Sequence, residues 1–500
     1  MLKMSELRGV LRIGIEISTE KNKTKLLDKM LLKAMDISGC DAGTLYLCRE
    51  GKLEFKIMKT LSQGVSRGEN GESIDLPPVE LREENVCAYS AIRRELVNIP
   101  DVYDSDKFDF SGPKRYDGIT GYRTKSMLVI PMEDAEDRVI GVLQLINKLD
   151  ESGNVIGFTD DDAFVLRSLG SMAAVSLSNM IYLQQIQLQM GSFVQAFATA
   201  VDKRTPYNGS HTRKVTIYAE LVARYMNSLY EKGEGGECFD EARTEQLKLA
   251  AGLHDIGKMI VPLSIMNKST RLDEGLERVK SRFDYIGLLY ERDMLRGDIS
   301  PETYAEKKAE LEDARATVLA ADGAGFLPDE MLAKVEGVSA LVYRGVDGRE
   351  IPYLTDEETV CLKVRKGTLT ADERKVMESH AEMTRTILEQ VYFTEKYAKA
   401  PKFASEHHEL LDGSGYPDRL VAEQLETETR ILTVVDVFDA LTCTDRPYKK
   451  PIPRDRAISI LYSMVDEGKM DRYIVQMLEG ALVGVSEADI EQRASESFSF

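Results

Sequence analysis

The sequence predicts two domains of different class, an α+β domain of about 180 residues and an all-α domain, with one long helix between them. Strand-like apolar runs bounded by turn residues gather before residue 150. Between residues 164 and 197 apolar positions recur every three or four residues without a proline, and most of the later chain has helical spacing too. At 500 residues the chain has room for two or three domains.

The first domain is expected over residues 1–182. Apolar residues from Leu26 to Ile37 recur at spacings of three and four, which predicts an amphipathic helix. Four strands are expected after it, at residues 42–48, 53–58, 126–132 and 139–147. Residues 49–52 join the first two strands as a hairpin, and a helix of about residues 160–190 closes the domain. This arrangement is typical of an α+β sensor unit.

The linker between the domains is expected to be helical. Residues 183–195 belong to the apolar stripe of residues 164–197, which includes Met190 and Phe193. A helix of this length needs a second surface to cover its stripe, so we expect a parallel homodimer along it. Packing on its own two domains alone is the alternative that the sequence leaves open.

The second domain, residues 196–500, is expected to be an almost wholly helical bundle. One helix begins at His211, and a later helix delivers His254 and Asp255. A capping box over residues 370–373 starts the helix that bears His380. Ligands that come from separate helices suit a rigid metal centre.

An insertion of about residues 270–366 is expected inside this bundle. Its apolar residues follow a heptad-like rhythm, and Ser300-Pro301 provides the cap and first turn of a second helix. A small glycine-rich hairpin is expected at residues 343–349. The sequence does not decide whether this helical hairpin covers the site or contacts a signalling-protein partner.

The doublet His254-Asp255 is the main chemical signal of the chain. It follows an apolar helical run that should be buried, and burying an imidazole with a carboxylate is costly unless a charged or hydrogen-bonding group receives them. All five His of the chain lie in short polar stretches. The candidate ligands are His211, His254, Asp255, His380, His407, His408 and Asp436. Neutral imidazoles with bridging carboxylates suit two ions of iron, manganese or zinc.

In their order along the chain, these residues resemble the HD-GYP subgroup of the HD metal-dependent phosphohydrolases. The resemblance rests on His211, the His254-Asp255 doublet, His380, the His407-His408 pair, Asp412-Gly413-Ser414-Gly415-Tyr416-Pro417 and Asp436, over about residues 196–485 apart from the insertion. It implies a catalytic domain that hydrolyses cyclic di-GMP to linear pGpG, GMP or both. It also implies one ion on His254, Asp255 and Asp436, a second on Asp255, His380, His407 and His408, and His211 in the same cluster.

Departures and further positions refine this expectation. Tyr207 stands where members with three metals have a Glu, so we expect two divalent ions, of iron or manganese. By resemblance, substrate contacts come from Gly415, Tyr416 and Pro417, and from Arg446 and Lys449 in a basic segment. Lys258 lies one helical turn beyond His254 and could stabilise phosphate charge in the transition state, although a solvated surface lysine is the alternative.

The expected reaction is attack on a phosphodiester by a hydroxide that bridges two ions, with Asp255 and Lys258 as the catalytic residues. One alternative is a different HD phosphohydrolase, acting on cyclic GMP-AMP, a mononucleotide or an alarmone. Another is a non-catalytic module that signals by binding a cyclic dinucleotide. The Gly-Tyr-Pro turn argues against mononucleotides and alarmones, and the complete ligand set argues against the silent module.

The end of the first domain resembles the GAF family of small-molecule-binding regulatory domains. The resemblance rests on Asn147-Lys148, Phe158 and Asp162, and the sequence departs from the family signature at Ala163. It implies a GAF-like sensor with a small-molecule ligand that the sequence does not identify. A salt bridge between Lys148 and Asp162 that pins a loop is the structural alternative.

Composition bounds the partners and the compartment. A net charge of -19 argues against binding of a nucleic-acid polymer. We expect a cytoplasmic protein without a membrane segment, because the first residues lack the apolar core of a signal peptide and no run of about 18 apolar residues occurs. The six Cys are scattered, so we expect reduced thiols, no disulfide and no Cys metal site.

Overall fold

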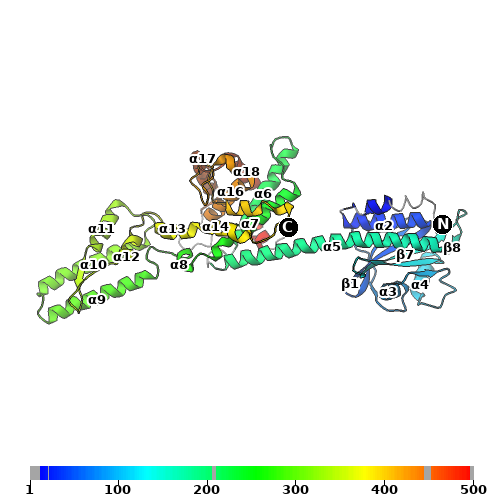
Figure 1. Cartoon of the computed structure of the whole chain (residues 1–500), viewed down its shortest axis with the longest axis horizontal. Helices are drawn as coiled ribbons and strands as arrows, with labels where there is room; N and C mark the ends of the chain where they lie inside the picture. The colour runs from blue at the N-terminus through cyan, green and yellow to red at the C-terminus, as the bar shows by residue number, and fades with distance from the viewer. Residues whose placement is uncertain (1–11, 18, 21, 205–209, 444–451, 496–500) are drawn as a thin grey trace. The chain divides into compact units, whose positions relative to one another are not determined.

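The computed structural model describes residues 12–495 apart from residues 18, 21, 205–209 and 444–451. Its contacts divide the chain into two compact units, Met1–Gln187 and Leu188–Phe500, and each is described by itself. The first unit contains a sheet with flanking helices and the second is built mainly of helices (Figure 1). The predicted α+β and all-α classes are confirmed.

One antiparallel sheet with the strand order β3-β2-β1-β7-β6-β5 forms the first unit. Its long strands are β1 (Cys40–Arg49), β2 (Lys52–Thr60), β6 (Met127–Glu133) and β7 (Val139–Leu149), which are the four predicted ones. Its short strands, which were not predicted, are β3 (Val65–Arg67), β4 (Val79–Glu80), β5 (Val97–Ile99) and β8 (Val155–Ile156). Glu50 and Gly51 adopt positive φ angles of 47° and 73°, which makes the predicted hairpin turn between β1 and β2 tight.

Alternate residues of the strands face two separate cores. Leu45 and Leu47 pack on one face with α2 (Lys23–Ser38) and the first turns of α5 (Asp160–Asp202), whereas Tyr46 packs on the other face with α3 (Val86–Arg93). The helix α4 (Ser111–Thr120) completes the unit. The helices before and after the strands therefore share one face of the sheet, while α3 and α4, which were not predicted, belong to the long connection before β6.

The GAF-like signature residues pin a loop. Asp162 forms an ion pair with Lys148 and accepts the backbone N–H and hydroxyl of Thr159 at 2.7 and 2.8 Å, at the start of α5. Asn147 accepts the N–H of Lys125 at 2.7 Å. The structural alternative for Lys148 and Asp162 is therefore the role that their geometry supports.

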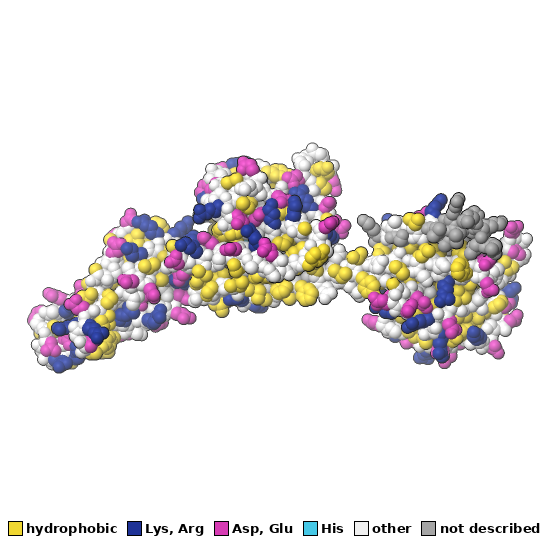
Figure 2. All heavy atoms as spheres, in the orientation of Figure 1, with side chains coloured by type: hydrophobic (Ala, Val, Ile, Leu, Met, Phe, Trp, Pro, Cys, Tyr) yellow, Lys and Arg dark blue, Asp and Glu magenta, His cyan; other side chains and the backbone are white. Residues whose placement is uncertain are grey.

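The helix α5 runs without interruption for 43 residues. Its side toward the sheet buries Leu166, Leu169 and Leu177. Large apolar side chains that stay exposed on it are Phe164, Met172, Val175, Leu183, Ile186, Leu188, Phe193 and Phe197, and Figure 2 shows hydrophobic side chains along it. In the described part of the chain, α5 is also the one helix whose length and composition would suit a membrane span; its most apolar window has a mean hydropathy of 1.3 and is 44% buried. The dimer stays a prediction.

The second unit is a helical bundle interrupted by the insertion. Its helices are α6 (His211–Glu231), α7 (Glu241–Leu253), η1 (Ile256–Met259), α8 (Leu263–Met266), α13 (Ala371–Glu378), α14 (His380–Leu388), η2 (Glu395–Tyr397), α15 (Ala400–Ser405), η3 (Ala422–Gln424), α16 (Thr427–Thr442), α17 (Arg454–Asp466), α18 (Arg472–Ala481) and α19 (Glu487–Ser495). Val222, Phe403 and Phe438 lie in one core that joins α6, α15 and α16. This core fixes the helix ends that carry the candidate ligands.

The insertion has a core of its own. It consists of α9 (Gly275–Leu295), α10 (Pro301–Gly323), α11 (Asp329–Ser339), the hairpin of β9 (Val342–Arg344) and β10 (Glu350–Pro352), and α12 (Asp356–Leu362). Ser300 caps α10 as predicted, by accepting the N–H of Thr303 at 3.2 Å. Phe283 and Val318 pack together in the insertion core with Tyr353. At its base the fully buried Arg271 donates to the carbonyls of Val364 and Ala321, at 2.7 and 2.8 Å.

Candidate metal centre

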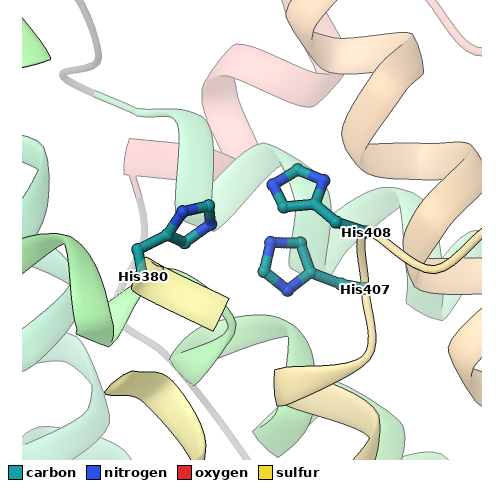
Figure 3. A group of neighbouring side chains, drawn as sticks. All are labelled: His380, His407 and His408. Atoms are coloured by element: carbon teal, nitrogen blue, oxygen red, sulfur yellow. The ribbon is translucent and has the colours of Figure 1, made fainter. Parts of the chain in front are cut away.

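All seven predicted ligands lie at one place in the bundle, and most come from helix ends. His211 is the first residue of α6, His254 follows the last residue of α7, and His380 is the first residue of α14. The capping box of residues 370–373 begins the preceding helix α13, so the prediction that it starts the helix bearing His380 is wrong. His407 and His408 follow α15, while Asp436 lies within α16. Figure 3 shows His380, His407 and His408 turning their rings toward one shared space from two separate elements.

Asp255 lies between two sets of imidazoles. Its Oδ2 lies 3.5 Å from Nε2 of His211 and 3.4 Å from Nε2 of His254. Its Oδ1 lies 3.6 Å from Nε2 of His380 and 3.9 Å from Nε2 of His407. Each oxygen therefore faces a different pair of rings, which is the geometry of a bridging carboxylate.

Asp436 also lies beside imidazoles from separate elements. Its Oδ1 lies 3.2 Å from Nε2 of His211, and its Oδ2 lies 3.7 Å from Nδ1 of His408. Among the described residues, three sets of side chains bring their ligand atoms within 4.8 Å of one another, and they are His211, His254 and Asp436; His380, His407 and His408; and His254, Asp255 and His407. The first set places His211 beside the predicted ligands of one ion.

The ring nitrogens present lone pairs inward. Nδ1 of His254, His380 and His407 lies 2.7, 2.6 and 2.7 Å from the backbone carbonyl three residues earlier, so Nδ1 must donate. Burial lowers the pKa of His380 and, well below its ordinary value, that of His407, so these two rings are neutral at neutral pH. In this tautomer Nε2 carries the lone pair that a metal needs.

A cation fits these residues because several inward atoms are buried without a partner. Among the described residues, Nε2 of His254, His380 and His407 and Oδ1 of Asp255 form no hydrogen bond within the protein. Buried polar atoms are rarely left unsatisfied, since each costs about 1–3 kcal/mol. Their common direction toward two carboxylates supports binding of divalent ions.

Negative charge at the centre is concentrated on the two carboxylates, Asp255 and Asp436. Burial raises the pKa of Asp255, but Lys258, whose Nζ lies 2.6 Å from Oδ2, and the neighbouring imidazoles outweigh it and hold the pKa well below its ordinary value. Burial likewise raises the pKa of Asp436, but the hydrogen bond from His211 contributes most to a pKa well below normal. Burial lowers the pKa of His211, yet hydrogen bonds to three carboxylates hold it well above normal. A metal ion would take the place of that proton.

Lys258 is not a solvated surface lysine in this structure. Its side chain is 20% exposed and its ammonium group pairs with Asp255. Gly257 beside it touches the start of α14, where a Cβ atom would lie 1.9 Å from the carbonyl oxygen of His380. Only glycine allows this approach, which holds η1, and with it Lys258, against the helix that carries His380.

The Gly-Tyr-Pro turn lies beside His408. The ring of Tyr416 lies 4.8 Å from the ring of His408, and burial raises the pKa of the tyrosine hydroxyl, which therefore stays protonated. A Cβ atom on Gly415 would lie 2.4 Å from the backbone nitrogen of Leu410, so this residue must be glycine. Pro417 follows Tyr416 in the turn. The predicted contacts Arg446 and Lys449, and Tyr207, lie outside the described residues.

Three supporting residues were missed by the sequence reasoning. Asp439 lies 2.7 Å from Nδ1 of His211, and its spacing of three from Asp436 on one helix was a usable signal. Thr384 accepts the N–H of Gly257 at 3.1 Å and donates to the carbonyl of His254 at 2.9 Å. Glu409 accepts three backbone N–H groups of residues 418–420, at 2.7, 3.1 and 2.9 Å, and thereby shapes the turn. Orienting partners of this kind fix metal ligands.

Two family models match the chain. Residues 22–177 match the GAF domain and residues 357–474 match the HD domain. The HD range contains His380, His407, His408 and Asp436, whereas the doublet and His211 precede it. The matched segment begins within α12 of the insertion, and the helices that supply the other ligands lie before the insertion.

Curated relatives match parts of the chain. A 3'3'-cGAMP-specific phosphodiesterase of Vibrio cholerae is 23% identical over 268 residues, which is 54% of this chain and 34% of the relative. A cyclic di-GMP phosphodiesterase response regulator of Xanthomonas campestris is 43% identical over 102 residues, 20% of this chain and 26% of the relative. A dual cyclic-AMP and -GMP phosphodiesterase of Takifugu rubripes is 31% identical over 170 residues, 33% and 18% of the two chains. The chain therefore spans about a third or less of the length of these relatives.

Solved structures similar to part of the chain include the GAF domain of an Acinetobacter phosphoenolpyruvate-protein phosphotransferase. It is 20% identical, with a TM-score of 0.28, over 36% of this chain and 95% of that one. A GAF domain/HD domain protein from Geobacter sulfurreducens is 16% identical, with a TM-score of 0.23, over 35% and 98%. From its family matches and its own sheet and bundle, the chain contains a GAF domain followed by an HD domain.

Proposed function

We propose that this protein is a metal-dependent phosphodiesterase that hydrolyses a cyclic dinucleotide, with cyclic di-GMP as its preferred substrate. The observation that carries the proposal is the convergence of five imidazoles and two carboxylates, in which one inward atom each of His254, Asp255, His380 and His407 lacks a partner within the described part of the protein. Structural metal sites are closed by four ligands, and seven candidates exceed that number. Two of the curated relatives act on cyclic dinucleotides by name, which supports the substrate class.

Two divalent ions, iron or manganese, fit the ligand set best. Asp255 and Asp436 can each serve two positions because their two oxygens face different imidazoles. Imidazole-rich sites with carboxylates suit these metals. When bound, two such ions supply Lewis acidity that makes water nucleophilic at neutral pH and neutralises phosphate charge.

The residues of the chain have separate tasks in this proposal. The imidazoles of His254, His380 and His407 offer Nε2 lone pairs, held inward by their Nδ1 bonds. Lys258, with its ammonium group at the edge of the cluster, would contact a phosphate oxygen and stabilise charge in the transition state. Tyr416 keeps its hydroxyl proton and can donate it in a hydrogen bond to the substrate, with Gly415 and Pro417 shaping its turn. Arg446 suits a two-point contact with guanine or phosphate, and Lys449 a phosphate contact.

Substrate choice and chemistry are tested together. Full-length protein is incubated without oxygen with Fe(II) or Mn(II) and with cyclic di-GMP, 3'3'-cyclic GMP-AMP, a mononucleotide or an alarmone, and the products are separated as linear dinucleotide and mononucleotide. We expect pGpG or GMP from cyclic di-GMP at the highest rate. If only cyclic GMP-AMP is hydrolysed, the protein is still a cyclic-dinucleotide phosphodiesterase but cyclic di-GMP is not its substrate. Binding of a cyclic dinucleotide without hydrolysis would favour the non-catalytic module.

The role of the metal centre is tested by Asp255→Ala. This change should abolish both metal content and turnover, because it removes the carboxylate that faces both imidazole sets. Asp240→Ala is the matched control, since Asp240 caps the same helix α7 by accepting the N–H of Arg243 at 2.8 Å but lies outside the cluster. A folded Asp255→Ala chain that holds no metal yet keeps full activity would refute the proposal.

We also propose that the protein acts as a cytoplasmic homodimer in which α5 links the GAF domain to the HD domain. Asp202, the last residue of α5, accepts the hydroxyl of Thr212 at 2.9 Å, next to His211. Arg204, just beyond α5, donates to the carbonyl oxygens of Met259 and Val261, next to Lys258. The end of α5 thus contacts the stretches beside two parts of the centre. A small shift of the helix would reach both, and metal chemistry tolerates little misplacement.

A further inference from the structure

A second candidate site lies in the GAF domain, at the β2 side of the sheet. A cavity of about 470 Å³ opens between the first turn of α2, the strand β2 and the loop that follows β3. This size falls within the range of small-molecule sites. Its apolar wall contains Leu27, Ile57, Leu76 and Pro78.

Three cationic side chains line this cavity, and they are Lys23, Arg49 and Lys56. The carboxylates of the cavity are largely engaged already. Glu54 lies 2.7 Å from Lys56 and 4.0 Å from Arg49, and Glu72 accepts the backbone N–H groups of Gly68 and Asn70, at 2.7 and 3.0 Å. With three cations and two carboxylates, the lining of the cavity has an excess of one positive charge.

Lys23 is the most constrained of the three cations. It is the first residue of the 16-residue helix α2, where the helix dipole adds positive potential. Burial lowers its pKa, and the charges of Arg49 and Lys56 lower it further. The charged form of Lys23 is destabilised by these effects, so an anion that binds beside it would stabilise it.

From the cavity, its cations and its apolar wall, we infer that this is a binding site for a small organic anion, a phosphate monoester or a carboxylate with an apolar body. The anionic group lies between Lys23 and Arg49, and the apolar body lies on Leu27 and Ile57. The site is on the α2 side of the sheet, whereas Tyr46 and α3 form the opposite core.

The same two cations also face α5. Lys23 and Arg49 line a neighbouring cavity of about 320 Å³, whose other walls include Ser178, Ile181 and Tyr182 of α5. An anion that draws both cations into the first cavity removes them from the wall beside α5. The ligand would thus act on the helix that leads out of the GAF domain, and this last step rests on the proposed role of α5.

Binding is tested by calorimetry with phenyl phosphate and benzoate as probes, and with inorganic phosphate and benzyl alcohol for comparison. The full chain carries Asp255→Ala, so that the metal centre adds no phosphate binding. We expect one or both aromatic anions to bind, inorganic phosphate to bind more weakly, and benzyl alcohol not to bind. Lys23→Gln and Arg49→Gln should each weaken binding about fivefold or more, as expected for loss of a partly exposed charge contact.

Lys25→Gln is the matched control, because Lys25 is exposed on the same turn of α2 and does not line the cavity. It should leave the affinity unchanged, and melting curves should show that all three variants are folded. The inference fails if the unmodified cavity binds neither anion. It also fails if benzyl alcohol binds as well as they do, or if Lys25→Gln and Lys23→Gln have equal effects. None of these outcomes bears on hydrolysis at the metal centre, which is measured separately.

Discussion

Removing the carboxylate of Asp439 should weaken metal binding although Asp439 is not itself a predicted ligand. Asp439 is 1% exposed and its Oδ2 lies 2.7 Å from Nδ1 of His211. This bond orients the ring so that Nε2 points at Asp255 and Asp436. Loss of such an orienting partner costs about 10- to 100-fold in metal affinity, which corresponds to about 1.4–2.7 kcal/mol.

Two substitutions separate orientation from charge. Asp439→Ala removes the acceptor and should show the full loss of affinity. Asp439→Asn keeps an oxygen that can accept from Nδ1–H, so its loss should be smaller, about threefold to tenfold. Manganese affinity is measured by competition with a chromogenic chelator, and the melting temperature of the metal-free chain is recorded beside it.

The control for a general loss of stability is Glu245→Gln. Glu245 is buried on α7, accepts the hydroxyl of Tyr397 at 2.6 Å and pairs with Lys396, outside the cluster. It should lower the melting temperature without changing manganese affinity. If Asp439→Ala binds manganese as tightly as the unmodified chain, His211 does not depend on this bond and the orientation argument is wrong.

Three further predictions concern the centre, the insertion and the dimer. Gly257→Ala should lower manganese content and activity together, because its Cβ atom would lie 1.9 Å from the carbonyl oxygen at the start of α14; a fully loaded and active variant would contradict this. Glu358→Gln should destabilise the insertion at pH 7 by about 1.5–3 kcal/mol, since it breaks a charged pair with Arg282 at 2.6 and 3.0 Å. Burial raises the pKa of Glu358 but the bonds from Arg282 outweigh it, so the folded pKa lies below the unfolded one. The stabilisation is therefore present above about pH 4.5 and lost as pH falls through the folded pKa. The free energies of unfolding of the unmodified chain and of Glu358→Gln, measured with denaturant, should therefore become equal in acid. Replacing Met190 and Phe193 with Glu should give monomers, measured by light scattering, whose activity is altered and whose metal content is retained. If the unmodified chain is already monomeric at micromolar concentration, the proposed coupling of the two domains through a dimer of α5 is wrong.

The sequence predicted the parts of the fold that follow one local pattern. The long strands of the first unit were found because each is an apolar run bounded by turn residues, and α10 was found because Ser300-Pro301 marks its start. The two- and three-residue strands such as β4 and β8 carry too few positions to show any period. The helices α11 and α12 were missed because the insertion was interpreted as a hairpin of two helices, and its packing around Tyr353 appears only in three dimensions.

The metal ligands could be found in the sequence because imidazole and carboxylate side chains are rare in buried, apolar surroundings and therefore stand out by type. The residues that orient these ligands do not stand out in the sequence. Thr384 is an ordinary residue of α14 until the fold brings it between Gly257 and the carbonyl of His254, 130 residues earlier in the chain. Asp439 differs, because its place one turn after Asp436 follows from helix geometry alone. A contact within one element is thus open to sequence reasoning, whereas a contact between elements needs the packing that creates it.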